Sequence, residues 1–436
     1  MRKPLVLIAL ILLLVALIPG SVQAQGEISA STTTEIKFPT SLTFHLKASL
    51  SPISSAVITK ITLRYKINKI TTATVVSEVE PEFDPGPVVE TSWEWDMRKA
   101  GLPTGAEINY RWRIKDALGQ VMETPWETVT FDDDRYSWDQ LTEDKVSLLW
   151  YQGTRGFAQE LLDAALEAQE KLARDIGAYL EQPAKIYIYA NYDDLQGALV
   201  YAQEWTGGRA FTEYGIVVIG VATGNLEWGK RAMVHELAHL VTYQMTFNPY
   251  GDMPTWLNEG LSKYAEGDLQ SRDQSMLSEA ISEDKLISVQ SLSSGFPADP
   301  EQANLSYVQS YSLVEFLISD YGSERMLQLL GVFKQGAAYD KALEEVYDFD
   351  AERLDTLWRA SLGLGPRPTP LVVAPTPTPI TTSYLPPKAG DGCAAPSTGS
   401  SSGVAILGNL SILLVLPTTA EAIHLRSRNR RKECHN

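Results

Sequence analysis

The feature that most constrains the fold is a change in hydrophobic periodicity near residue 134. Between residues 25 and 134, apolar and polar residues alternate in short runs such as Ile61–Ile67 and Ile108–Ile114, with Pro- and Gly-rich turns between them. A period of two is typical of antiparallel strands that bury one face, so this segment predicts an all-β sandwich. A few short strands and then helical spacing follow, which predicts an α+β domain over residues 140–362.

Both ends of the chain carry signals for export and attachment. Residues 1–24 combine a basic start, an apolar run and a small-residue site, which predicts a cleaved signal peptide, with an uncleaved signal anchor as the alternative. Residues 363–403 are rich in Pro, Gly and Ser and predict an extended linker. Residues 404–425 are apolar enough to span a bilayer, and the basic residues 426–436 would then form a cytoplasmic tail. The same region also resembles a bacterial sorting signal, so we expect a cell-surface protein that is anchored or released after processing.

Charge and cysteine content argue against a nucleic-acid-binding protein and against domains that depend on disulfides. The formal charge is −17, and it becomes −22 (30 basic against 52 acidic side chains) without residues 1–3 and 421–436. Such a body would repel phosphate backbones, which argues against nucleic acid as a partner. The two cysteines, Cys393 and Cys434, lie outside both predicted domains, so the domains cannot depend on disulfides.

The residues that indicate chemistry lie in the segment Val234–Leu240, VHELAHL. His235 and His239 are four residues apart, so on a helix both imidazoles face one side and can reach a single ion. Glu236 lies about 100° around the helix from His235, close enough to reach a metal-bound water. The helix is apolar on most sides, so its polar groups need a buried partner, which a zinc ion would supply. A pair of hydrogen-bonded core histidines is the alternative.

A second motif follows in Pro254–Ser262, PTWLNEGLS. The pair of motifs resembles the gluzincin zinc metallopeptidases, and especially bacterial peptidase MA-like domains, in which an HExxH helix precedes a W-L-x-E-G helix. The resemblance covers most of the second domain and implies a thermolysin-like α+β catalytic fold. It also implies Zn²⁺ held by His235, His239 and Glu259, with Glu236 as the general base. The N-terminal sandwich resembles immunoglobulin-like or fibronectin-like modules in architecture alone.

The resemblance implies a mechanism. Zinc lowers the pKa of its bound water to about 7, and Glu236 takes the proton from that water and passes it to the leaving amine. Gluzincins use Tyr or His to donate a hydrogen bond to the developing oxyanion. No histidine lies between His239 and His424, so a tyrosine is favoured. Tyr307 is the first candidate and Tyr311 the second, and for either the alternative is a packing role.

Three further segments carry expectations. The strand at Tyr214–Val221 precedes the histidine helix, and the resemblance implies that it is a sheet edge holding extended substrate, with an ordinary core strand as the alternative. Thermolysin-like enzymes have an acidic residue one turn after the third ligand, where this chain has Lys263; Glu266 is the candidate to orient a histidine instead. The run Asp132–Asp134 lacks the spaced ligands of a calcium loop and predicts a solvated junction.

These observations predict a zinc-dependent metallopeptidase that hydrolyses peptide or protein substrates outside the cytoplasm. One alternative is a non-catalytic surface adhesion or binding protein with a structural zinc site. Another is a metallohydrolase of the same fold that acts on a non-peptide amide or ester.

Overall fold

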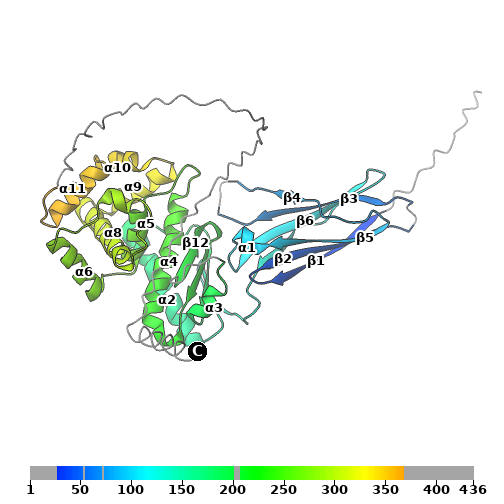
Figure 1. Ribbon diagram of the computed structural model, residues 1–436, viewed down its shortest axis with the longest axis horizontal. Helices are drawn as coiled ribbons and strands as arrows, with labels where there is room; N and C mark the ends of the chain where they lie inside the picture. Colours follow the sequence, from blue (N-terminus) through cyan, green and yellow to red (C-terminus); the bar gives the residue numbers. More distant parts are fainter. Residues whose placement is uncertain (1–26, 53–54, 71–72, 201–206, 368–436) are drawn as a thin grey trace, which may run out of the picture. The chain divides into compact units, whose positions relative to one another are not determined.

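The computed structural model describes residues 27–52, 55–70, 73–200 and 207–367. The predicted signal peptide, membrane segment and basic tail lie outside these residues. The described chain falls into two compact units, with the boundary between Arg135 and Tyr136 and with residues 69–70 grouped with the second unit. Figure 1 shows the first unit as blue and cyan strands and the second as a green to orange mixture of strands and helices.

The first unit is a sandwich of two antiparallel sheets, as the alternating pattern predicts. One sheet has the order β1-β2-β5, and the other has the order β4-β3-β6-β7 with β8 also paired to β6. The elements are β1 (Ile28–Lys37), β2 (Ser41–Leu50), β3 (Ile58–Ile67), β4 (Ser77–Val79), β5 (Val88–Asp96), α1 (Met97–Ala100), β6 (Ala106–Asp116), β7 (Val121–Glu123) and β8 (Glu127–Phe131).

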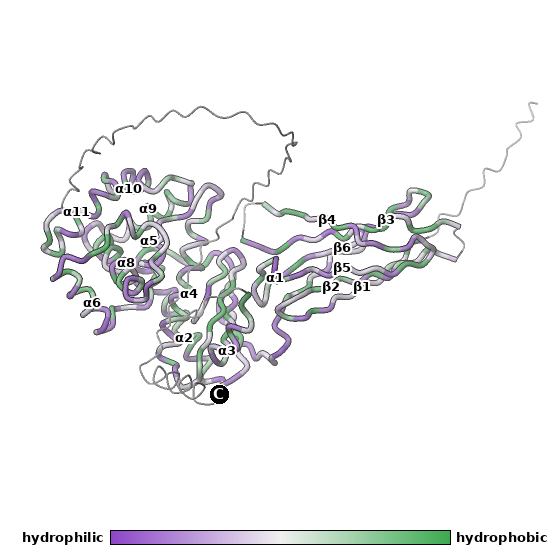
Figure 2. Tube along the Cα trace, in the orientation of Figure 1, coloured by the Kyte–Doolittle hydropathy of each residue, from purple (hydrophilic) through white to green (hydrophobic). Residues whose placement is uncertain are grey.

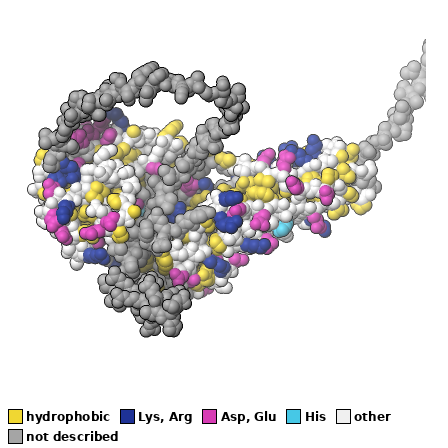
Figure 3. Space-filling model, in the orientation of Figure 1, with side chains coloured by type: hydrophobic (Ala, Val, Ile, Leu, Met, Phe, Trp, Pro, Cys, Tyr) yellow, Lys and Arg dark blue, Asp and Glu magenta, His cyan; other side chains and the backbone are white. Residues whose placement is uncertain are grey.

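Aromatic side chains join the two sheets of the sandwich. The Phe44 ring on β2 meets the Tyr110 ring on β6 at a centroid distance of 4.9 Å, and Trp112 donates a hydrogen bond to Thr32 across the sheets at 3.1 Å. Figure 2 shows hydrophobic and hydrophilic residues interspersed along these strands, and in Figure 3 acidic and basic side chains mingle on the visible face. The Asp132–Asp134 run is not wholly solvated, because Asp133 is buried and its carboxylate receives two hydrogen bonds from the Arg135 guanidinium.

The second unit begins with a mixed five-stranded sheet of order β12-β13-β11-β10-β9. The parallel strands β10, β11 and β13 form its centre, and antiparallel strands border them. Helices α2 and α4 pack against each other (Figure 1), and their apolar residues share one core with those of the sheet. The elements are β9 (Asp139–Glu143), β10 (Val146–Trp150), α2 (Arg155–Ile176), β11 (Ala184–Tyr189), α3 (Tyr192–Gln196), β12 (Gly208–Phe211), η1 (Thr212–Tyr214), β13 (Ile216–Gly220), η2 (Thr223–Asn225) and α4 (Leu226–Thr246).

The expectation that the strand at Tyr214–Val221 is the sheet edge is wrong. This strand is β13, and it lies between β11 and β12. The chain reverses at Gly215, whose φ of 67° suits glycine, so that the four residues of β12 pair antiparallel with β13 and cover its outer side. The edge strand beside α4 is therefore β12.

Helices complete the second unit. Helix α5 packs against α4 on one side and against α8 on the other, and α8 is largely buried. Gly260 permits the close approach of α5 to α8, because a Cβ at this position would lie 2.4 Å from the Ser310 carbonyl oxygen. None of the helices within the described ranges combines the length and apolar character needed to cross a bilayer. The elements are α5 (Thr255–Ala265), α6 (Ser271–Ser282), α7 (Val289–Leu292), α8 (Pro300–Tyr321), α9 (Ser323–Lys334), α10 (Tyr339–Tyr347) and α11 (Ala351–Ser361).

The described chain ends in a segment that packs on the helical region, although the sequence predicts linker from residue 363. Arg359, which is 1% exposed, donates a hydrogen bond from Nε to the Gly365 carbonyl at 2.9 Å. Arg367 forms an ion pair with Asp355 at 2.8 Å and donates to the Leu286 carbonyl. These contacts make residues 363–367 part of the folded unit.

Candidate metal centre

The two histidines of α4 lie side by side in the interior of the second unit. His235 and His239 are each 1% exposed, and their ring centroids are 4.9 Å apart. Met233, Leu237 and other apolar residues of the same helix are buried around them. The helix therefore holds two imidazoles on one face, shielded from solvent.

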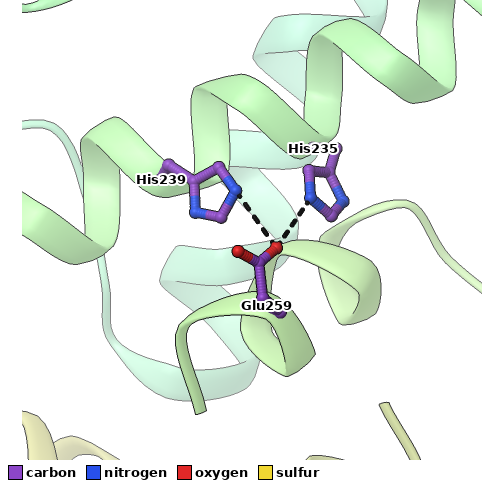
Figure 4. A group of neighbouring side chains, drawn as sticks. All are labelled: His235, His239 and Glu259. Atoms are coloured by element: carbon purple, nitrogen blue, oxygen red, sulfur yellow. Dashed lines mark hydrogen bonds and ion pairs between the residues drawn. The ribbon is translucent and has the colours of Figure 1, made fainter. Parts of the chain in front are cut away.

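Glu259 reaches the same point from α5 (Figure 4). Its Oε2 atom lies 3.2 Å from Nε2 of His235 and 3.5 Å from Nε2 of His239. The three possible ligand atoms all lie within 4.8 Å of one another. Trp256 and Leu257 are fully buried on the preceding turn and fix the position of α5. The residues that the two sequence motifs nominate as ligands are thus brought together.

The other ring nitrogen of His235 is held by a carboxylate. Nδ1 lies 2.8 Å from Oε1 of Glu266, and the second Glu266 oxygen accepts a hydrogen bond from Lys263 at 3.0 Å. Lys263 also pairs with Asp273 of α6 at 3.2 Å. With Tyr307, these residues line a cavity of about 90 Å³ behind the histidine. Glu266 thus lies where a residue that orients His235 would have to be, and Lys263 supports Glu266.

The other ring nitrogen of His239 is held by neutral groups. Nδ1 lies 3.1 Å from the side-chain oxygen of Asn258 and 3.0 Å from the hydroxyl of Ser262. Thr242 donates a second hydrogen bond to Asn258 at 3.2 Å. Sequence reasoning missed Asn258 and Ser262 as positioning residues, although both lie within the Pro254–Ser262 motif. Because both Nδ1 atoms are engaged, each histidine directs Nε2 toward Glu259.

Glu236 is buried beside the edge strand β12. Both of its carboxylate oxygens, like Nε2 of His239, have no hydrogen-bond partner within the described part of the chain. Burial raises the pKa of Glu236 to about 7, and the nearby histidines only partly oppose that rise. Gly208 makes room for the side chain, because a Cβ there would lie 3.3 Å from Cγ and Oε1 of Glu236.

Without an ion, the three converging side chains favour an ion pair. Burial alone would lower the pKa of His235, but its hydrogen bonds to Glu259 and Glu266 outweigh burial and raise the pKa to about 10. Burial alone would raise the pKa of Glu259, but the neighbouring histidines lower it to about 2. A bound metal ion would therefore displace a proton from His235.

The donor set fits a zinc-type ion. Two imidazole nitrogens and one carboxylate oxygen are ligands that zinc accepts, and three protein ligands are typical of its catalytic sites. Within the described residues, Nε2 of His239 and both oxygens of Glu236 are buried without hydrogen-bond partners, which is costly unless a ligand engages them. The arrangement could hold a metal ion and a polarised water or substrate oxygen beside a carboxylate base.

Comparison with known proteins agrees with this geometry. Residues 164–363, which include α4, α5 and α8, match the family model described as Peptidase MA superfamily. The chain carries a peptidase MA superfamily domain. No protein with a curated function matches the sequence.

Two solved structures show a distant likeness to this chain. The M1 zinc metallopeptidase of Deinococcus radiodurans, bound to a Tyr-Ser-Ala substrate, is 13% identical with a TM-score of 0.36, and the match covers 79% of this chain and 94% of that one. Aminopeptidase A of Legionella pneumophila, in complex with aspartic acid, is 11% identical with a TM-score of 0.33, covering 77% and 49%. Neither likeness carries an inference about activity.

The two candidate tyrosines of the peptidase MA domain lie in different surroundings. The Tyr307 ring lies 6.0 Å from the His235 ring between centroids, and burial together with three nearby carboxylates raises its pKa. Tyr311 is one turn further along α8, about 6 Å away along the axis. Its hydroxyl donates to Glu315 at 3.2 Å. The structure thus brings Tyr307 to the histidines but not Tyr311, because that hydroxyl is turned to its own helix.

Proposed function

We propose that this chain is a zinc-dependent metallopeptidase of the gluzincin type. The observation that carries the proposal is the convergence of two imidazole nitrogens and a carboxylate oxygen within 4.8 Å, beside a buried glutamate without a hydrogen-bond partner in the described chain. His235, His239 and Glu259 would hold the ion. Bound zinc would polarise the scissile carbonyl and lower the pKa of its water to about 7.

Glu236 is suited to act as the general base. Burial raises its pKa in the metal-free site, and a carboxylate in this position can accept a proton from a metal-bound water and release it again to a leaving amine. Neither of its oxygens is committed to a hydrogen bond within the described residues, so both are available to the reacting groups. Tyr307 is the candidate donor to the developing oxyanion, since its raised pKa keeps the hydroxyl protonated.

The edge strand β12 is suited to hold the peptide. Among the described strands it pairs only with β13, so the backbone groups of its outer side remain available to an added strand. Gly208 brings this edge into contact with Glu236. A peptide bound along β12 in extended form would therefore pass beside the proposed base. This assignment replaces β13 with β12 as the substrate-holding strand.

Two other functions are less well supported. A structural zinc site is usually closed by four protein ligands. Among the described residues three converge here, beside a Glu236 whose oxygens accept no hydrogen bond from those residues. A metallohydrolase acting on a non-peptide amide or ester would use the same groups. Digestion of a peptide library separates that possibility from a peptidase.

The test measures metal content and cleavage on the purified chain. We expect about one zinc per chain, and His235→Ala or His239→Ala should remove tight binding because a two-ligand remnant holds zinc poorly. His45→Ala is the matched control, since this half-exposed histidine belongs to the sandwich. Full zinc content in either α4 variant would refute the ligand assignment. Zinc-loaded wild-type protein that cleaves no peptide would refute the proposed peptidase function.

Export and attachment are proposals from the sequence. The basic and apolar start of the chain supports export, and the apolar segment at residues 404–425 followed by a basic tail supports attachment to a membrane or removal during sorting. Both segments lie outside the described residues. Cell fractionation together with the mass of the mature protein distinguishes an anchored chain from a processed one.

A further inference from the structure

Arg209 is a cation at the edge of the proposed substrate site. It lies in β12, immediately after Gly208, which touches Glu236. Its side chain is partly buried, and the guanidinium lies over the Phe211 ring at 4.5 Å from the ring centroid. The Glu236 carboxylate is close enough for the two charges to interact, although the two groups form no direct ion pair. Because side chains alternate along a strand, Arg209 and Phe211 lie on the face of β12 opposite Gly208, and Arg209 is still close enough to feel the charge of the proposed base.

Arg209 differs from most of the other partly or fully buried arginines that the structure describes. Four partly or fully buried arginines each form an ion pair with a carboxylate: Arg64 with Glu78, Arg111 with Glu123, Arg359 with Asp284 and Arg367 with Asp355. Arg209 forms no ion pair and its guanidinium makes no hydrogen bond in the part of the chain that the structure describes. Burial also lowers its pKa, which shows that its surroundings do not compensate the charge in full.

A partly desolvated guanidinium without a partner is costly, and an anion that binds there would offset the cost. A carboxylate matches the planar fork of arginine and can accept two hydrogen bonds from it. The position along β12 restricts where that carboxylate lies. A peptide paired to the outer side of β12 places its residues near the scissile bond within reach of the long arginine side chain.

We propose that Arg209 binds a carboxylate of the substrate, so that this site selects peptides with an anionic group close to the scissile bond. The carboxylate is that of an Asp or Glu side chain or of a free C-terminus. The inference rests on the proposed peptidase function and adds a substrate class to it. Arg209 acts in this scheme as a specificity-determining residue.

The test uses the full chain with two sets of peptides. The first set carries Glu or Gln at each position flanking the scissile bond, with an amidated C-terminus throughout. The second set carries only uncharged side chains and ends in a free or an amidated carboxyl group. Cleavage is measured as kcat/KM on the wild-type background, and binding is measured as Kd on the Glu236→Gln background, where turnover does not interfere.

Arg209→Met keeps the length of the side chain and removes the charge, and Arg155→Met is the matched control because Arg155 is exposed at the start of α2. We expect Arg209→Met to weaken binding and kcat/KM for the preferred anionic peptide roughly 10- to 100-fold, as for loss of a charged hydrogen bond. Peptides without the carboxylate should change less than about twofold, and Arg209→Lys should restore part of the loss. The peptide set whose cleavage depends on Arg209 identifies whether the bound carboxylate belongs to a side chain or to a free C-terminus.

Two outcomes overturn the inference. Equal losses for charged and uncharged peptides, mainly in kcat, would mean that Arg209 acts on Glu236 rather than on substrate. Cleavage without any preference for peptides that carry a carboxylate would agree with the proposed peptidase function and refute the proposed selectivity for anionic peptides. Binding of anionic peptides that depends on Arg209, with no cleavage of any peptide, would support the inference and refute the proposed function. Zinc content and thermal unfolding of each variant confirm that the fold is unchanged.

Discussion

Replacing Glu236 by Gln should remove most of the activity and should also stabilise the metal-free protein at neutral pH. Glutamine keeps the size of the side chain but cannot accept a proton, so we expect kcat to fall on the order of 10²- to 10⁴-fold with little change in KM. Zinc content should stay at the wild-type level because Glu236 is not one of the three converging ligands.

The stability effect follows from the pKa of Glu236, which is raised from 4.5 to about 7 by burial. Below pH 4.5 the carboxyl is protonated in both the folded and the unfolded chain and carries no penalty. Between pH 4.5 and 7 the folded chain binds more protons, so its free energy of unfolding falls as pH rises. Above pH 7 the full penalty applies, on the order of 3 kcal/mol at about 1.4 kcal/mol per pKa unit. Glutamine is neutral at every pH, so the variant does not carry this desolvation penalty.

Urea unfolding in the presence of a metal chelator, at several pH values from 4.5 to 8.5, measures the difference between the two proteins. The variant should match wild type near pH 4.5 and exceed it by up to about 3 kcal/mol near pH 8. Glu345→Gln is the control, since Glu345 is exposed on α10 and should show no such trend. A difference that does not change with pH would refute the burial argument. Wild-type turnover in the Glu236 variant would refute the assignment of the base.

Three other changes test the surroundings of the site. Gly208→Val should displace Glu236 and lower kcat on the order of 10²-fold while zinc is retained. Peptide cleavage and metal analysis measure the two effects, and unchanged cleavage would mean that β12 does not constrain the position of Glu236. Glu266→Gln should weaken zinc affinity roughly 10- to 100-fold in a chelator competition, because His235 loses its charged hydrogen-bond acceptor. An unchanged zinc affinity would show that Glu266 does not orient His235. A chain ending at Leu362 should unfold at a lower temperature than one ending at Arg367, and equal melting temperatures would show that the terminal segment contributes nothing.

The parts of the protein that depend on local spacing could be predicted from sequence. The β-rich and helical halves follow from hydrophobic periods of two and 3.6, which each segment expresses on its own. The pairing of His235 with His239 is of the same kind, because a helix brings residues four apart to one face whatever surrounds it. Glu259 was nominated only through the resemblance of its motif, since a separation of 24 residues specifies no distance.

The remaining features are determined by packing between elements, which local sequence patterns do not specify. Strand β12 has four residues and no clear alternation, so only its pairing with β13 reveals it as the sheet edge. The supports of the two histidines, Asn258 and Glu266, depend on how α5 packs against α4, and Gly260 sets how closely α5 approaches α8 on its other side. The choice between the tyrosines of α8 depends on how that helix is rotated where it packs against α5. Such contacts join residues distant in the chain, and only the tertiary structure determines them.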